Sequence, residues 1–82
     1  MFQFMPKSIK IRKVLEAMKK LGFKEIRRKG SHVFFEHKDG RTTVIPLHSE
    51  IHIHLLTKIV KKDLKIEMDE FQKAIGHENP KK

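Results

Sequence analysis

The spacing of apolar residues predicts a helix near the start of the chain. Beyond Ser8, apolar residues recur every three or four positions, as they do along one face of a helix. Ser8 suits the N-cap, because its hydroxyl can accept a hydrogen bond from an otherwise unpaired backbone N–H. Gly22 suits the position just past the last turn, where a left-handed residue commonly ends a helix. The apolar residues with this spacing are Ile11, Val14, Leu15, Met18 and Leu21.

Beyond Gly22 the pattern changes to short runs of β-branched and aromatic residues. Residues 23–29 predict a first strand, residues 32–37 a second and residues 42–45 a third. Gly30 marks the turn between the first two strands. Together these runs predict an antiparallel sheet of three strands.

Turn residues support this division. The pair Asp39-Gly40 supplies the positive φ that a tight hairpin needs, and Pro46 ends the third strand. Alternation along the second strand gives two faces but does not decide which one is buried. One face carries His32, Phe34 and Glu36, and the other carries Val33, Phe35 and His37.

Two helical patterns follow the strands. Residues 53–62 predict a second helix, residues 63–66 a turn, and residues 68–75 a short third helix that ends at Gly76. Strands bracketed by helices predict an α+β fold in which helices cover one face of the sheet.

Charge is distributed unevenly over the 82 residues, whose formal net charge is +9. Residues 1–30 hold ten Lys or Arg and two Glu, a net of +8, whereas residues 31–82 hold nine basic and eight acidic residues, a net of +1. A concentrated basic segment attracts polyanions, among which nucleic acid is the usual one. A basic surface that only keeps the protein soluble is the alternative, although an even spread of charge would serve that purpose equally well.

Composition excludes several classes of protein. The chain has no cysteine, so it has neither a disulfide framework nor a thiolate zinc site. No apolar run approaches the ~20 residues of a membrane span, and the start, MFQFMP, lacks the regions of a signal peptide. We therefore expect a cytoplasmic protein with no membrane partner. Its single domain is expected to cover residues 6–76, followed by a flexible charged tail at 77–82.

The six histidines raise the question of a metal site. His48 and His52 are four residues apart, and His52 and His54 are two apart. On a helix the first pair would share a face, as zinc ligands often do. No HExxH sequence and no third ligand at fixed spacing accompany them. The pattern favours histidines at the surface or in contact with RNA, and we expect neither a metal nor another cofactor.

A basic cluster, a glycine and a histidine follow one another in the stretch RRKGSH, residues 27–32. The glycine lets another backbone come close, and the strand fixes the position of His32. An imidazole titrates near neutrality and can move a proton during cleavage of an RNA phosphodiester, while nearby cations stabilise charge on the phosphate. The sequence has no phosphate-binding glycine loop and no nucleophile signature around a serine. From these residues alone, a structural and a catalytic histidine are equally supported.

Several short motifs occur in an order that resembles the HicA family of toxins (YcfA-like), the mRNA interferases of bacterial and archaeal toxin–antitoxin pairs. The similarity covers about residues 6–75. The motifs are Leu21-Gly22-Phe23, Lys29-Gly30-Ser31-His32, Ile45-Pro46-Leu47-His48 and Asp69-Glu70-Phe71, with helices before the first motif and between the last two.

The resemblance implies a double-stranded-RNA-binding-domain-like fold, with a helix, a three-stranded antiparallel sheet and a further helix. It also implies cleavage of mRNA without a metal, with His32 as the catalytic residue. The partner would be a HicB-type antitoxin that covers this histidine, and DNA would be contacted only indirectly, through the antitoxin.

We therefore interpret the chain as an endoribonuclease toxin in which the 2′-hydroxyl of the substrate is the nucleophile. A noncatalytic RNA-binding module of the same fold, which reads duplex shape through phosphate and 2′-hydroxyl contacts, is the main alternative. A subunit of a regulatory complex that binds DNA is a third interpretation. The expected RNA-binding residues are Lys24, Arg27, Arg28, Lys29, Gly30, Ser31 and His48.

Overall fold

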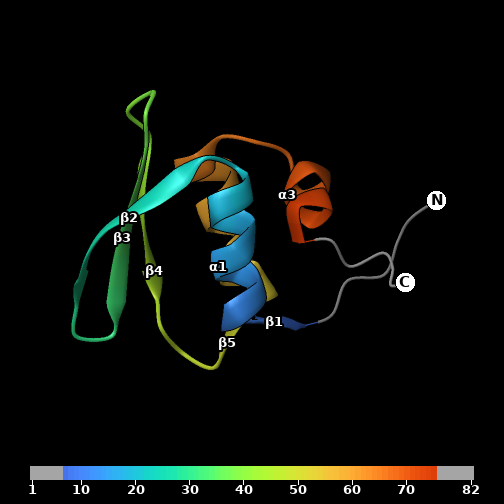
Figure 1. The fold of residues 1–82 in the computed structure, drawn as a ribbon. Helices are drawn as coiled ribbons and strands as arrows, with labels where there is room; N and C mark the ends of the chain where they lie inside the picture. The colour runs from blue at the N-terminus through green and yellow to red at the C-terminus, as the bar shows by residue number, and fades with distance from the viewer. Residues whose placement is uncertain (1–6, 76–82) are drawn as a thin grey trace, which may run out of the picture.

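The computed structural model describes residues 7–75, which form an α+β fold (Figure 1). All the helices lie on one side of a three-stranded sheet, and the other face of that sheet is left open (Figure 1). In chain order the elements are β1 (Ser8–Lys10), α1 (Ile11–Lys20), β2 (Phe23–Lys29), β3 (His32–His37), β4 (Thr42–Pro46), β5 (Glu50–His52), α2 (Ile53–Lys58), the π-helix η1 (Ile59–Leu64) and α3 (Met68–Ile75).

The three-stranded sheet has the order β2-β3-β4, and both strand pairs are antiparallel. The predicted α+β architecture, a helix followed by a three-stranded antiparallel sheet and further helices, is therefore confirmed. Gly30 and Gly40 adopt φ angles of +57° and +102° in the two connecting turns, which explains why glycine stands at both positions. The third strand includes Pro46, one residue more than expected.

The core lies between this sheet and the helices. On β3, Val33 and Phe35 are fully buried. The face that carries these two residues is therefore the buried one, which alternation alone did not decide. His32 and Glu36 are exposed on the opposite face, and Phe34 between them is partly exposed. The fully buried residues that α1, β4, β5, α2, η1 and α3 contribute to this core include Val14, Met18, Ile45, Ile51, Leu56, Val60, Leu64 and Phe71.

A second, two-stranded ribbon was not predicted. β1 pairs with β5 in antiparallel register, with Ile9 opposite Ile51. Ser8 belongs to this ribbon, and its hydroxyl donates a hydrogen bond to the carboxylate of Glu50. The prediction that Ser8 caps the first helix is therefore wrong: the N-cap residue is Lys10, which makes no side-chain capping bond. Pairing with β5 keeps Ser8 in an extended backbone, three residues before the first residue of the helix.

The second predicted helix has two parts. α2 ends at Lys58, and the chain continues as the π-helix η1 to Leu64, where the prediction placed a turn from residue 63. A π turn joins residues five apart, so Ile59 and Leu64 come to lie on the same side, and both are buried. Lys65 ends the segment in a left-handed conformation with a φ of +61°. The third helix occupies its predicted range, with Phe71 and Ile75 buried.

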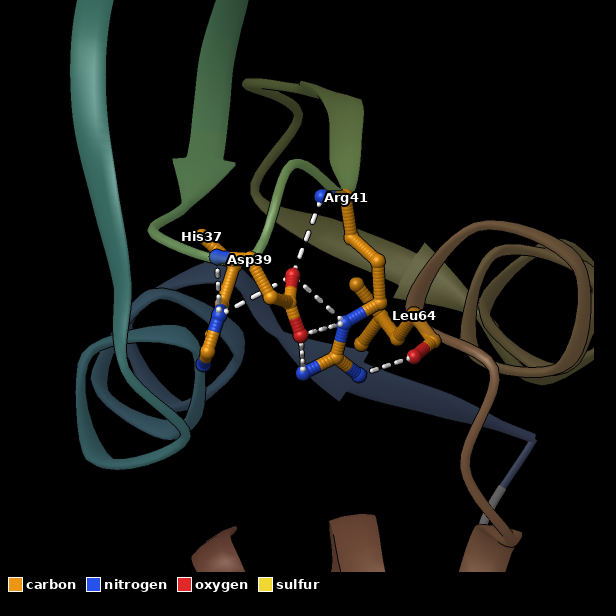
Figure 2. Close-up of polar contacts among 4 residues, drawn as sticks. All are labelled: His37, Asp39, Arg41 and Leu64. Carbon is orange, nitrogen blue, oxygen red and sulfur yellow. Dashed lines mark hydrogen bonds and ion pairs between the residues drawn. The ribbon is translucent and has the colours of Figure 1, made fainter.

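The hairpin between β3 and β4 is tied to the end of η1 (Figure 2). The guanidinium of Arg41 binds the Asp39 carboxylate, with Nη2–Oδ2 at 2.8 Å, and also donates to the backbone carbonyl of Leu64. The Asp39 backbone N–H donates to Nδ1 of His37 at 3.1 Å. Arg41 also lies over the ring of Phe23, 5.3 Å from its centroid. These contacts hold the turn against the covered side of the sheet, away from His32.

The predicted domain limits, residues 6–76, remain a prediction. Gly76 and the tail at 77–82 lie outside the described residues, as does Pro6.

Candidate nucleic-acid interface

His32 opens the central strand on the uncovered face of the sheet. In the register of the sheet it stands between Lys29 on β2 and Pro46 on β4. The backbone N–H of Leu47 donates to the carbonyl of Ser31 at 2.6 Å, which holds the loop after β4 against the turn before β3. His48 follows Leu47 directly, so the motifs Lys29-Gly30-Ser31-His32 and Ile45-Pro46-Leu47-His48 meet at one end of the sheet.

An aromatic and a guanidinium lie next to His32. Phe34 is two residues further along β3 on the same face, and its partner on β2 is Arg27. The guanidinium carbon of Arg27 lies 4.6 Å from the centroid of the Phe34 ring, which is the geometry of a cation–π contact. Val44 is the partner of Phe34 on β4, and its side chain is exposed.

A β-bulge in β2 determines which basic residues face His32. The register shifts between Glu25 and Arg27, so Ile26 has no partner on β3. Beyond the bulge, Arg27 and Lys29 pair with the outward residues Phe34 and His32, and Arg28 pairs with the buried Val33. Without the extra residue, simple alternation from Phe23 would have placed Arg28 on the open face.

Arg28 binds a carboxylate on its own strand. Two of its nitrogens donate to the Glu25 carboxylate, each at 3.0 Å. The hydrogen bond from Arg28 lowers the pKa of Glu25, and the same bond raises the pKa of Arg28. Of the three consecutive cations expected to hold RNA, the structure thus brings Arg27 and Lys29 to the face of His32 and places Arg28 on the other face.

The remaining expected RNA-binding residues are spread along the sheet. Gly30 and Ser31 form the exposed turn beside His32. Lys24 shares the open face but stands opposite Glu36, at the far end from His32. His48 is exposed in the loop after β4.

The other two histidines of the spacing pattern, His52 and His54, lie at the start of α2. His52 is the N-cap of α2, and its Nδ1 accepts a hydrogen bond from the backbone N–H of His54 at 3.1 Å. The two imidazole rings lie side by side with centroids 4.9 Å apart. Within residues 7–75, no group of three or more His, Cys, Asp or Glu is placed to hold a metal ion.

The sequence did not indicate that an apolar strip accompanies His32 on the open face. Ile26, Phe34 and Val44, together with Arg27, line a shallow groove across the three strands. Ile26 is 54% exposed and Val44 is 37% exposed. The alternation of β3 already placed Phe34 beside His32, but the contribution of β2 depends on the bulge, which alternation does not predict.

These features define a small α+β protein with a basic, partly apolar open sheet face. A family model of the HicA toxin of bacterial toxin–antitoxin systems matches residues 11–66 of the chain. The chain therefore belongs to the HicA toxin family, and family membership implies a cognate antitoxin. A comparison with curated proteins found no match. Among the described residues, no helix has the length and apolar composition needed to cross a membrane.

Proposed function

We propose that this toxin is an endoribonuclease that cleaves mRNA on the open face of the sheet, with His32 as the catalytic residue. The observation that carries the proposal is the position of His32. His32 is exposed at the start of the central strand of the sheet, with Lys29 beside it and the Gly30–Ser31 turn next to it. A phosphodiester bound at this end of the sheet would lie close to both a proton carrier, His32, and a cation, Lys29.

The chemistry uses a nucleophile that the RNA itself carries. His32 accepts the proton of the 2′-hydroxyl, and the 2′-oxygen attacks the adjacent phosphorus. The P–O5′ bond breaks, and the departing oxygen takes up a proton from the solvent or from a protonated imidazole. The products are a 2′,3′-cyclic phosphate and a 5′-hydroxyl end. Lys29 stabilises the negative charge that builds up on the phosphoryl oxygens.

The test of this proposal is RNA cleavage by His32 variants. We expect His32→Ala to lower the cleavage rate by about 10²- to 10⁴-fold, which is the usual contribution of one acid–base group. Because the side chain is exposed, the variant should unfold at the same temperature as the wild type. His32→Gln, which keeps some hydrogen bonding, is a second and milder test. His54→Ala is the matched control, since this exposed histidine lies outside the site.

The substrate offers an independent test of the nucleophile. An oligonucleotide with a single 2′-deoxy sugar at the cleaved position should remain uncut, and a chelator should not slow cleavage of the normal RNA. Unchanged cleavage by a folded His32→Ala protein, with contaminating nucleases excluded, would remove His32 from the catalytic role. If that variant and the wild type both bind RNA but neither cuts it, the noncatalytic RNA-binding alternative would be supported instead.

The proposed partners are mRNA as the substrate and a HicB-type protein as the antitoxin. A protein that inhibits cleavage by covering His32 would have to occupy the same open face. The cytoplasm, where mRNA and such a partner occur together, is the proposed location.

A further inference from the structure

The apolar strip beside His32 has a chemistry that phosphate binding does not require. Phe34, Ile26 and Val44 are the side chains of this strip, and two of them are among the large apolar residues that the described chain leaves exposed. A face that bound only phosphates would gain nothing from them. The basic residues around the strip, Arg27 and Lys29, favour a polyanion as the occupant of the face.

We propose that Arg27 and Phe34 form a stacking platform for one nucleobase of a single-stranded RNA, next to the phosphate that lies at His32. The proposal rests on the proposed function for the position of that phosphate. Bases in single-stranded RNA stack on aromatic rings and on guanidinium planes, and every base offers such a face. Here the two kinds of surface are combined, with the guanidinium 4.6 Å from the ring centroid.

The spacing along β3 suits a nucleotide. His32 and Phe34 are two residues apart on one face, which separates them by about 6.5 Å along the strand. This is comparable to the separation between a phosphate and the base of the same nucleotide. Val44 and Ile26 border the ring on either side, so a base lying on the platform would cover apolar surface that is now exposed.

The guanidinium of Arg27 favours stacking on a base over a purely electrostatic contact with a phosphate. A lysine would supply the same charge, but only a guanidinium is planar and can lie flat between a ring and a base. The bulge at Ile26 is what brings Arg27 opposite Phe34. A duplex does not suit this surface, because its bases are already stacked and its faces are not available.

The experiment compares binding of two oligomers of about eight nucleotides, a length typical of single-strand sites. One is oligoadenylate, and the other is an abasic oligomer with the same phosphates and sugars. Both are tested against the His32→Ala protein, so that cleavage cannot interfere. We expect the abasic oligomer to bind about 5- to 100-fold more weakly, the usual contribution of a stacked base.

Two substitutions in that background separate stacking from charge. Phe34→Leu and Arg27→Lys should each weaken oligoadenylate binding severalfold and leave abasic binding unchanged. Phe34→Tyr in the same background keeps the ring, and its affinity for oligoadenylate should lie within about twofold of that of the parent. The fluorescence of 2-aminopurine in place of adenine should be quenched by the parent and less so by Phe34→Leu.

Equal binding of oligoadenylate by the parent and a folded Phe34→Leu protein would overturn the proposal. An equal loss for both oligomers would also overturn it, since the residue would then act through the phosphates or the fold. If Phe34→Leu weakens binding only to a purified antitoxin and not to RNA, the strip is a protein interface and the stacking platform is wrong. Failure of the catalytic proposal would appear separately, as wild-type binding without cleavage.

Discussion

The hydroxyl of Thr43 donates a hydrogen bond to the carboxylate of Asp63 at 2.7 Å, and this bond joins the last strand of the main sheet to the π-helix. Thr43 is only 5% exposed. Its side chain points into the covered side of β4, whereas the neighbouring Thr42 points to the open side. One part-buried hydrogen bond thus helps to position η1 on the sheet.

Replacing Thr43 by valine is expected to lower the free energy of unfolding by about 1–3 kcal/mol, because a part-buried carboxylate loses its hydrogen-bond donor. Chemical denaturation would measure the change. Thr42→Val is the control, since the same substitution on the exposed side should change stability by less than about 0.5 kcal/mol. Equal effects at both positions would mean that the bond to Asp63 contributes nothing.

Gly22 and Gly40 both have positive φ angles, +92° and +102°, but only Gly22 is also crowded. A Cβ at Gly22 would lie 2.9 Å from Nε2 of His37, whereas nothing lies within 4 Å of the equivalent position at Gly40. We expect Gly40→Ala to destabilise the fold by about 1 kcal/mol from its backbone conformation alone, and Gly22→Ala by more. Thermal unfolding of the two variants would test this ranking, and a smaller effect at Gly22 would contradict it.

Stability should fall in acid as Asp39 takes up a proton. Hydrogen bonds from the side chain and backbone of Arg41 lower the pKa of Asp39 from 3.8 to about 2. Since the folded-state value is the lower one, this contribution to stability is present above about pH 4 and is lost as the pH falls towards 2. Asp39→Asn should therefore lower the unfolding temperature near neutral pH but not near pH 2. Glu67→Gln is the control for charge, and a difference that stays constant with pH would contradict the prediction.

The bulge in β2 predicts unequal roles for the three cations that precede Gly30. Replacing both Arg27 and Lys29 by glutamine should flatten the slope of log affinity for single-stranded RNA against log salt by up to about 1.4, or about 0.7 per phosphate contact. Arg28→Gln should change the slope little, because Arg28 binds Glu25 on the other face. A larger effect from Arg28 would show that RNA does not use the face of His32.

The strands could be predicted because their signals are local, and so could the place of His32 at the start of the second strand, although not the face that it occupies. Asp39-Gly40 fixes one hairpin, and the run from His32 to His37 is dense in β-formers. The bulge could not be predicted in the same way. Phe23 and Ile26, the apolar markers of the first strand, are three apart, a spacing that does not fit the alternation of a regular strand. The structure resolves this by burying Phe23 and exposing Ile26.

The short ribbon and the π-helix escaped prediction for different reasons. Ser-Ile-Lys and Glu-Ile-His each hold one apolar residue, too few to show a period, and they pair only because the chain folds back on itself. In the π-helix, burial of both Ile59 and Leu64 outweighs the α-helical spacing that the preceding residues suggest. Both features depend on tertiary packing, which no local pattern records.

The β1–β5 ribbon has a consequence for the order of folding. It joins residues 42 apart, such as Ser8 and Glu50, and the loop it closes contains both α1 and the whole main sheet. Closing that long loop costs conformational entropy before the ribbon gains any hydrogen bonds. The hairpins of the main sheet close loops of only a few residues, so their cost is smaller. We therefore expect the hairpins and α1 to assemble first and the ribbon last. Amide hydrogens of the ribbon should accordingly exchange with solvent sooner than those of β3, since the last element to form is the first to open.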